Sequence, residues 1–313
     1  MASWMTPHQR WYWQALLELT LRRLHGDAFQ GFFSDVMSKL HGDDFVPVRA
    51  FGRRGDKGCD GYLLQSGQLF QCYGKLHDAG LDVDGMVGKM EKDYGKAVAG
   101  LSVIMKEWHF VHNLFDGFPV EAIVKLKELE AANSQHKFGF IGPQGFEDRV
   151  LRLDEEHVVA LLGPAATAAD TRNMRMEEVS DLIKAVMASV DADQPDTGPI
   201  AVVPYDKLET NKITGCWHHL LVAGFSNAPH VRDYIDRHPE PELGTHLARV
   251  FKARYENLKL QGLKPNAILA SLYEGITGVG SVSPERQVAA HALLAYLFEA
   301  CDIFEDHPSK VNA

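Results

Sequence analysis

Hydrophobic residues follow two kinds of spacing in the first half of the chain. Apolar positions three or four residues apart predict amphipathic helices, whereas short alternating or continuous apolar runs predict strands. The helical spacing occurs in residues 8–24, 29–40, 86–103, 119–132 and 146–153. The strand patterns occur in residues 45–51, 62–64, 69–73, 108–112 and 138–141. This order predicts an α/β domain whose mixed sheet is flanked by helices, with Asp27 placed to cap the second helix.

The second half of the chain has almost only helical spacing. It occurs in residues 212–223, 228–237, 242–260, 265–277 and 284–305, and only 200–203 alternates like a strand. The last segment contains AAHALLAYLFEACDIFE. This stretch is apolar around much of a helix, so it predicts deep burial or burial against a partner.

Small, polar, proline-rich stretches separate the two halves. They lie at residues 163–173 and 191–199, on either side of a helix predicted at 176–190, and are typical of linkers. The pattern therefore predicts three parts. These are an α/β domain over residues 1–162, a linker with a short helix over 163–204, and an α-helical interaction domain over 205–313.

A glycine-rich turn separates the strands predicted at 45–51 and 62–64. It reads GRRGDKGCDG, with glycine at every third position and Asp56 and Asp60 between them. Glycines this dense permit backbone angles that other residues avoid, so we expect a tight turn. A carboxylate at a strand end, surrounded by basic side chains, suits a divalent metal that acts on a phosphodiester. The turn is therefore the first candidate for a functional site.

The string GRRGDKGCDGYLLQSGQLFQCY resembles the core of Mrr-type restriction endonucleases, a branch of the PD-(D/E)XK nuclease superfamily. The resemblance covers residues 25–150 and implies a restriction-endonuclease-like fold that binds Mg²⁺ or Mn²⁺ and cuts DNA. On this match Asp60 is the metal-binding aspartate, and Gln71 takes the second polar, metal-binding position. The lysine of the family falls on Tyr73, and the nearest lysine is Lys75.

The departures from the family pattern weaken the chemistry of this site. The amide oxygen of Gln71 is a poorer metal ligand than a carboxylate. Tyr73 can donate a hydrogen bond to a phosphate but lacks the charge of a lysine, which Lys75 could supply from the same face. Gln30 stands where the family has a helix glutamate, and Glu18 of the first helix is an alternative carboxylate.

Basic residues in and near the turn are the expected DNA contacts. Arg53, Arg54 and Lys57 would contact the phosphate backbone, and Asp56 could be a second metal ligand, although capping of the turn is the favoured role. Three lysines share a face of the predicted helix 86–103, where nearby acids favour a solvated surface over a phosphate contact: Lys89, Lys92 and Lys96.

The C-terminal stretch YLFEACDIFE resembles C-terminal regions of bacterial ABC-three-component antiphage defence systems. This resemblance covers about the last 100 residues, and it implies a helical domain that links an effector to partner proteins. An ATPase is a candidate partner, and a homo- or hetero-oligomer is expected.

Composition and charge restrict the possible functions. The chain has 313 residues, of which 45% are hydrophobic and 24% charged, as in an ordinary globular protein. A net charge of −10 argues against nonspecific coating of nucleic acid, although a local basic site remains compatible with it. The four cysteines are scattered, which favours a reducing cytoplasm over a disulfide framework or a zinc site. We see neither a signal peptide nor an apolar run of ~18 residues, and therefore expect a cytoplasmic protein without a membrane span.

Three functional hypotheses follow. In the first, the protein is a metal-dependent DNA endonuclease effector of an antiphage system, with its site at Asp60 and Gln71. In the second, the same fold is catalytically inactive and binds nucleic acid or scaffolds a multi-protein complex. The third hypothesis, a different α/β enzyme whose turn imitates the motif, is the least favoured.

Overall fold

The computed structural model describes residues 4–49, 56–76, 80–188, 207–300 and 303–304. The chain divides into two compact units: unit 1 comprises Met1–Trp4 and Leu17–Leu161, and unit 2 comprises Met5–Leu16 and Leu162–Ala313. This division lies one residue before the expected boundary, and it also assigns part of the first helix to unit 2. The segment expected as a linker at 163–204 belongs to unit 2 over its described part.

Unit 1 is an α/β unit. Its strands are β1 (Phe45–Pro47), β2 (Gly61–Leu63), β3 (Gln68–Tyr73), β4 (Glu107–His112) and β5 (Lys137–Ile141). They lie in the order β1-β2-β3-β4-β5, with β2 antiparallel to both neighbours and β3, β4 and β5 parallel. The main helices are α2 (Gly26–His41), α3 (Val83–Leu101), α4 (Val120–Ala132), α5 (Pro143–Val150) and α6 (Glu155–Leu162). The mixed sheet and α/β class expected from the sequence are confirmed.

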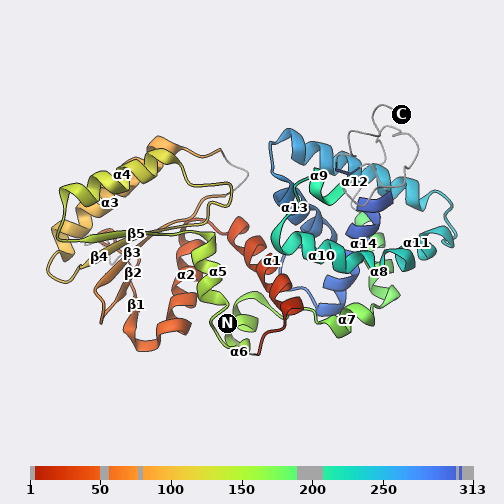
Figure 1. Ribbon diagram of the computed structural model, residues 1–313, viewed down its shortest axis with the longest axis horizontal. Helices are drawn as coiled ribbons and strands as arrows, with labels where there is room; N and C mark the ends of the chain where they lie inside the picture. Colours follow the sequence, from red (N-terminus) through yellow and green to blue (C-terminus); the bar gives the residue numbers. More distant parts are fainter. Residues whose placement is uncertain (1–3, 50–55, 77–79, 189–206, 301–302, 305–313) are drawn as a thin grey trace. The chain divides into compact units, whose positions relative to one another are not determined.

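Helices cover both faces of the sheet (Figure 1). On one face, Leu69 and Trp108 of the strands belong to a core that α3 and α4 complete. On the other face, Phe33 of α2 packs against Phe70 with ring centroids 5.3 Å apart. Because side chains alternate along a strand, Gln71 lies on the same face as Leu69, toward α3.

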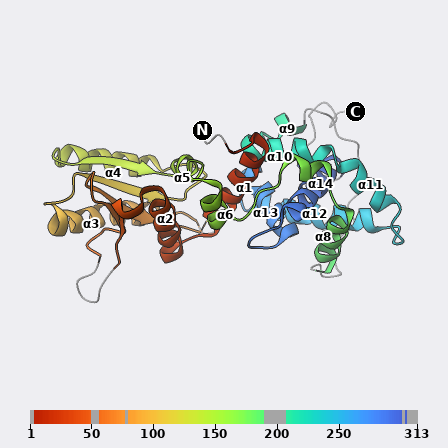
Figure 2. The ribbon, with the colours of Figure 1, turned by 90° about the horizontal axis from the view of Figure 1, so that it is seen from below.

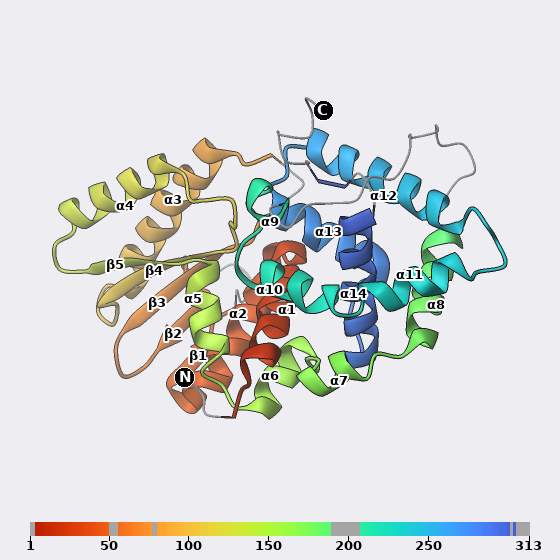
Figure 3. The same cartoon turned by 45° about the vertical axis from the view of Figure 1, so that its right-hand side comes forward.

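Unit 2 is built from helices around a buried central helix (Figure 3). The helices are α7 (Ala168–Arg172), α8 (Met176–Ala188), α9 (Lys207–Thr210), α10 (Gly215–Phe225), α11 (Ala228–Asp236), α12 (Leu243–Leu260), α13 (Pro265–Thr277) and α14 (Pro284–Ala300), with the first turns of α1 (Pro7–Arg23). α14 contacts α8, α10, α11 and α13, and residues 287–298 are all buried. The deep burial expected for this all-round apolar helix is confirmed.

Several helix ends differ from the sequence prediction. His25, not Asp27, is the N-cap of α2; Asp27 lies in the first turn, where its charge favours the positive end of the helix dipole. α5 begins at Pro143, because proline fits the first helical position. The strand expected over 45–51 ends at Pro47, which cannot donate to a ladder. The alternating stretch 200–203 lies outside the described residues.

Among the described ranges, no helix is both long enough and apolar enough to cross a bilayer.

Candidate functional site

Over its described part, the glycine-rich turn is closed by hydrogen bonds to Asp56. Asp56 Oδ1 accepts a hydrogen bond of 2.8 Å from the backbone N–H of Gly58, and the N–H of Cys59 donates to the Asp56 carbonyl. Gly58 has φ +70°, and a Cβ atom there would lie 2.2 Å from the carbonyl oxygen of Asp93. A side chain at position 58 would therefore push the turn off α3. Asp56 thus makes the turn-capping contact that the sequence favours for it.

Asp60 and Gln71 meet directly behind this turn. The N–H of Asp60 donates to the Phe70 carbonyl, which continues the β2–β3 pairing. Asp60 Oδ2 accepts hydrogen bonds from Gln71 Nε2 at 2.8 Å and from the Cys72 N–H at 2.7 Å. Both side chains are only 4% exposed. The hairpin register therefore brings together the two residues proposed as a metal pair.

The environment of Asp60 disfavours its charge. Burial raises the pKa of this carboxyl to about 6, while the hydrogen bond from Cys72 opposes the shift. The carboxylates of Asp56 and Asp93 raise the pKa further, and the ammonium of Lys89 lowers it. The carboxyl thus exchanges its proton close to neutral pH.

The donor set around Asp60 does not fit a divalent metal. A ligating amide must present its oxygen to the ion, but Gln71 turns its nitrogen toward Asp60. Within the described part of the chain, no group of three or more His, Cys, Asp or Glu side chains could hold a metal. The oxygen Oε1 of Gln71 is buried without a hydrogen-bond partner, and this feature favours an additional group there.

Tyr73 and Lys75 follow Gln71 but are held by other contacts. The Tyr73 ring stacks on Phe110 with centroids 5.7 Å apart, and burial raises the pKa of its phenol. Lys75 lies beyond the end of β3, where its backbone N–H donates to Asn113 Oδ1 and its carbonyl accepts from Asn113 Nδ2. Tyr73 therefore lies on the same face of β3 as Gln71, as the alternation of side chains predicts. The main chain of Lys75 is held by its hydrogen bonds to Asn113.

The remaining candidate residues do not converge on Asp60. Gln30 Nε2 donates to the Val48 carbonyl at 3.1 Å, and Glu18 accepts from Arg22 at 2.8 Å. Lys57 is exposed, and its side-chain carbons border Gly100 of α3. The other two residues expected to contact DNA lie outside the described residues: Arg53 and Arg54.

The α3 lysines are tied to a buried carboxylate. Lys96 lies 2.8 Å from Asp93 Oδ1, and Lys89 pairs with Asp93 Oδ2. Burial alone would raise the pKa of Asp93, but the two lysines outweigh it and lower this pKa. Two of the lysines considered as phosphate contacts are thus paired with an internal carboxylate.

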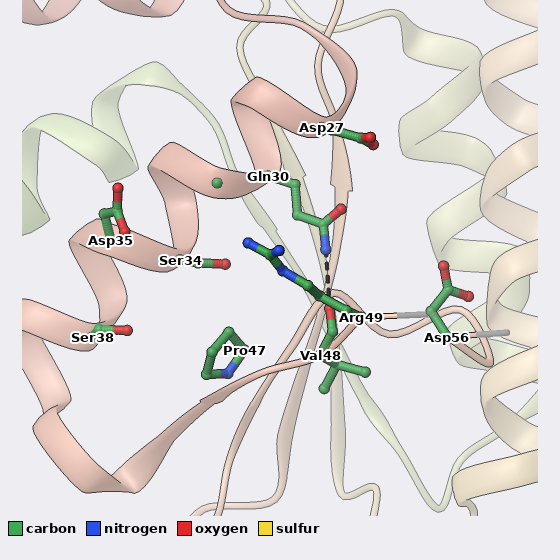
Figure 4. Close-up of a pocket in the computed structure, with 10 residues that line it drawn as sticks. Asp27, Gln30, Ser34, Asp35, Ser38, Pro47, Val48, Arg49 and Asp56 are labelled. Carbon is green, nitrogen blue, oxygen red and sulfur yellow. Dashed lines mark hydrogen bonds between the residues drawn. The ribbon is translucent and has the colours of Figure 1, made fainter. Parts of the chain in front are cut away.

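A separate pocket of about 580 Å³ lies between α2 and the chain that follows β1 (Figure 4). Its lining is polar and includes Asp27, Gln30, Gly31, Ser34, Asp35, Ser38, Pro47, Val48, Arg49 and Asp56. Neither Asp60 nor Gln71 belongs to it, so the pocket and the proposed metal pair are distinct. Sequence reasoning missed the two serines, although residues 30, 34 and 38 follow the four-residue spacing of one helix face.

Comparison with known proteins assigns the C-terminal part of the chain. Residues 177–305 match the family model of C-terminal domain 10 of the ABC-three component (ABC-3C) systems. No curated protein and no solved structure matches the chain. The match covers α8 and the helices from α9 to α14, so it agrees with the resemblance seen in the C-terminal sequence. The C-terminal part of the chain is therefore similar to this domain family, which supports a role as a component of an ABC-three component antiphage system that works with other proteins of that system.

Proposed function

We propose that this component is a scaffold whose α/β unit keeps a nuclease-like arrangement without metal-dependent hydrolysis. The observation that carries the proposal is the buried contact between Asp60 and Gln71, in which the amide N–H group of Gln71 donates to the carboxylate. Hydrolysis by a bound metal needs oxygen ligands around the ion and an open position for water.

The surroundings of the pair support the same conclusion. Tyr73 replaces the lysine expected in the family and packs on Phe110, so this side chain supplies no fixed positive charge. Gln30 replaces the helix glutamate and is engaged with the Val48 carbonyl. Each replacement removes a charge that would bind the metal or stabilise a developing phosphate charge.

The helical unit supplies the connection to the rest of the system. Its C-terminal domain family implies work alongside other proteins, and an ATPase is the candidate partner suggested by the sequence resemblance. In this proposal the α/β unit contributes a rigid body to the assembled complex, and chemistry resides in another component.

The competing function is a metal-dependent DNA endonuclease. It is favoured by the unpartnered Oε1 of Gln71, because this buried oxygen lies beside Asp60, the metal-binding aspartate on the family resemblance. Rotation of the amide would offer that oxygen to an incoming Mg²⁺ or Mn²⁺ ion.

Metal binding and cleavage separate the two functions. We expect calorimetric titration of the full chain with Mg²⁺ and Mn²⁺ to give no site-specific heat, and supercoiled and linear DNA to remain uncut in either metal. When the other proteins of the system are present, any cutting is expected to be the same with the wild type and with Asp60→Asn. The matched control is Asp60→Asn, which retains an oxygen acceptor for the two N–H groups at Asp60 Oδ2. Metal-dependent cutting by the wild type that disappears in Asp60→Asn would establish the nuclease instead.

A further inference from the structure

The first turn of α5 has backbone N–H groups without an acceptor. Gly142 is the N-cap of α5 and has the extended backbone usual for that position, with φ −99° and ψ −168°. A serine or aspartate there would accept hydrogen bonds from the N–H groups of Gln144 and Gly145, but glycine has no side chain to do so. Within the described part of the chain, no other group accepts from these two N–H groups. Two donors thus lie at the positive end of the helix dipole.

His112 places a third donor beside Gly142. This histidine ends β4 and is only 5% exposed. Its Nδ1 accepts from the Leu114 N–H at 3.2 Å, so the neutral ring carries its proton on Nε2. Nε2 itself has no hydrogen-bond partner among the described residues. A Cβ at Gly142 would lie 2.8 Å from Cε1 and 3.0 Å from Nε2 of the ring. This edge of the imidazole therefore stands where a capping side chain would begin.

The imidazole is held firmly and carries no charge. It stacks on Phe118 with ring centroids 4.4 Å apart and meets Phe140 edge-on at 6.4 Å. Burial lowers the pKa of His112 to about 4, and no charged group of the described residues contributes to this shift. The ring is therefore a neutral donor near physiological pH, with no carboxylate close enough to act on it. The acids of α5 follow in its second turn: Glu147 and Asp148.

Three donors thus border one small space that contains no acceptor. None of them can satisfy another, because a hydrogen bond needs an acceptor atom. The space lies at the carboxyl ends of parallel strands: Val111 pairs with Ile141, so His112 and Gly142 follow at the same level, and α5 continues directly from β5 (Figure 2). Ligands of open α/β sheets commonly bind beyond such strand ends, and free N–H groups at a helix N-terminus bind phosphate.

We propose that His112 and the first turn of α5 form a binding site for a phosphate group, presented by inorganic phosphate or by a small phosphate monoester. The N–H groups of Gln144 and Gly145 and the Nε2–H of His112 donate to its oxygens. A phosphate group has enough terminal oxygens to accept from all three donors. The proposal goes beyond the scaffold function and does not depend on whether unit 1 hydrolyses DNA, because the site contains neither Asp60 nor Gln71.

Amide NMR of the full chain, titrated with inorganic phosphate in a buffer free of other oxyanions, tests the site. The amide resonances of Gln144 and Gly145 are expected to shift until the site saturates. The matched control is the start of α13, which also begins with proline and whose N-cap also makes no side-chain hydrogen bond. Its amides, those of Asn266 and Ala267, should keep their positions. Equal shifts in both helices, or no saturable shift in α5, would overturn the proposal.

Two substitutions of His112 separate the Nε2 donor from packing. His112→Asn keeps an acceptor for the Leu114 N–H but its side chain is too short to place a donor at the position of Nε2. His112→Gln has the longer side chain, whose amide N–H reaches that position. Calorimetry should show phosphate binding weakened about 10-fold or more by His112→Asn, because one hydrogen bond to a charged group is lost, and largely retained by His112→Gln. Both variants lack the stacked ring, so equal affinities in the two would contradict the role of Nε2.

The choice of ligand identifies the source of the phosphate group. Adenosine 5′-monophosphate that binds more tightly than inorganic phosphate would assign the site to a phosphate monoester, and weaker binding would assign it to inorganic phosphate. Acetate has only two oxygens and is expected to shift the Gln144 and Gly145 amides less. Acetate as effective as phosphate would overturn the assignment to a phosphate group.

Discussion

Replacing Asn113 by alanine is expected to destabilise unit 1 by about 3–5 kcal/mol, by leaving several buried backbone groups unpaired. Asn113 is fully buried after the end of β4. Its Nδ2 donates to the carbonyls of Leu21, Leu24 and Lys75 at 2.8, 2.7 and 3.0 Å, and its Oδ1 accepts from the Lys75 N–H at 3.0 Å. One side chain thus joins the ends of β3 and β4 to the last turn of α1 and to Leu24 just beyond it.

The size of the effect follows from what the truncation leaves behind. An unpaired buried carbonyl or N–H costs about 1–3 kcal/mol, and four such groups lose their hydrogen bond to Asn113. The loss is below their sum, because Nδ2 has only two hydrogens to share among three carbonyls and water can enter the space.

Hydrogen exchange can assign this loss to unit 1. Amides of β3 and β4 should lose protection in Asn113→Ala, whereas amides of α13 and α14 in unit 2 should retain it. Asn133→Ala is the matched control: Asn133 is half-buried in the same unit, and its Nδ2 donates to the Leu129 carbonyl, so we expect a loss of about 1 kcal/mol. Similar losses of stability in both variants would show that Asn113 does not hold these segments together.

The sequence predicted what depends on local spacing. Element order and the mixed sheet followed from apolar periodicity, and the burial of α14 followed from its all-round apolar surface. The meeting of Asp60 and Gln71 agrees with the family resemblance, which assigns both residues to one site, and the β2–β3 register produces it.

What the sequence could not predict depends on contacts between distant segments. The role of Asn113 involves carbonyls about 90 residues earlier in the chain, at Leu21 and Leu24. The orientation of the Gln71 amide is decided by the carboxylate opposite it, which no spacing rule describes. The placement of α8 in unit 2 follows from packing against α13 and α14, whereas its proline-rich flanks resemble those of a linker.

Replacing Asp60 by asparagine is expected to stabilise unit 1 by about 1–3 kcal/mol at pH 7.5, through removal of a buried charge. The pKa of Asp60 is about 6 in the folded protein, against an ordinary value of 3.8. The folded state thus binds the proton more tightly than the unfolded state. The contribution of Asp60 to the stability of the folded state is complete below pH ~4. It is lost as the pH rises through 6, by about 3 kcal/mol in total. An introduced amide also offers an N–H group near the unpartnered Gln71 Oε1, while its own oxygen can accept from Gln71 and Cys72.

Urea unfolding from pH 4 to 8 can isolate this effect if wild type and variant are compared at each pH. The wild-type profile alone is insufficient, because a second group in the same unit also titrates in this range. Burial lowers the pKa of His112 to about 4. A histidine that is buried and neutral contributes stability that is lost as the pH falls from 6.5 toward 4. That contribution has the opposite sign and cancels in the difference. The gain from Asp60→Asn should therefore be near zero at pH 4 and constant above pH 7, whereas Asp56→Asn should change the free energy of unfolding by less than ~0.5 kcal/mol.

The sign of this difference has a direct bearing on function. A carboxylate kept at a cost in stability, in a position where an amide would be more stable, is characteristic of sites that perform chemistry or bind a cation. A scaffold gains nothing from such a charge, so a stabilised Asp60→Asn variant that still supports antiphage defence agrees with the scaffold proposed for unit 1. A stabilised variant that loses defence would instead show that the charge itself is required, and would favour the competing metal-dependent nuclease. A variant destabilised at pH 7.5 would contradict the charge argument, because it would mean that the ionised carboxylate strengthens the β2–β3 contact.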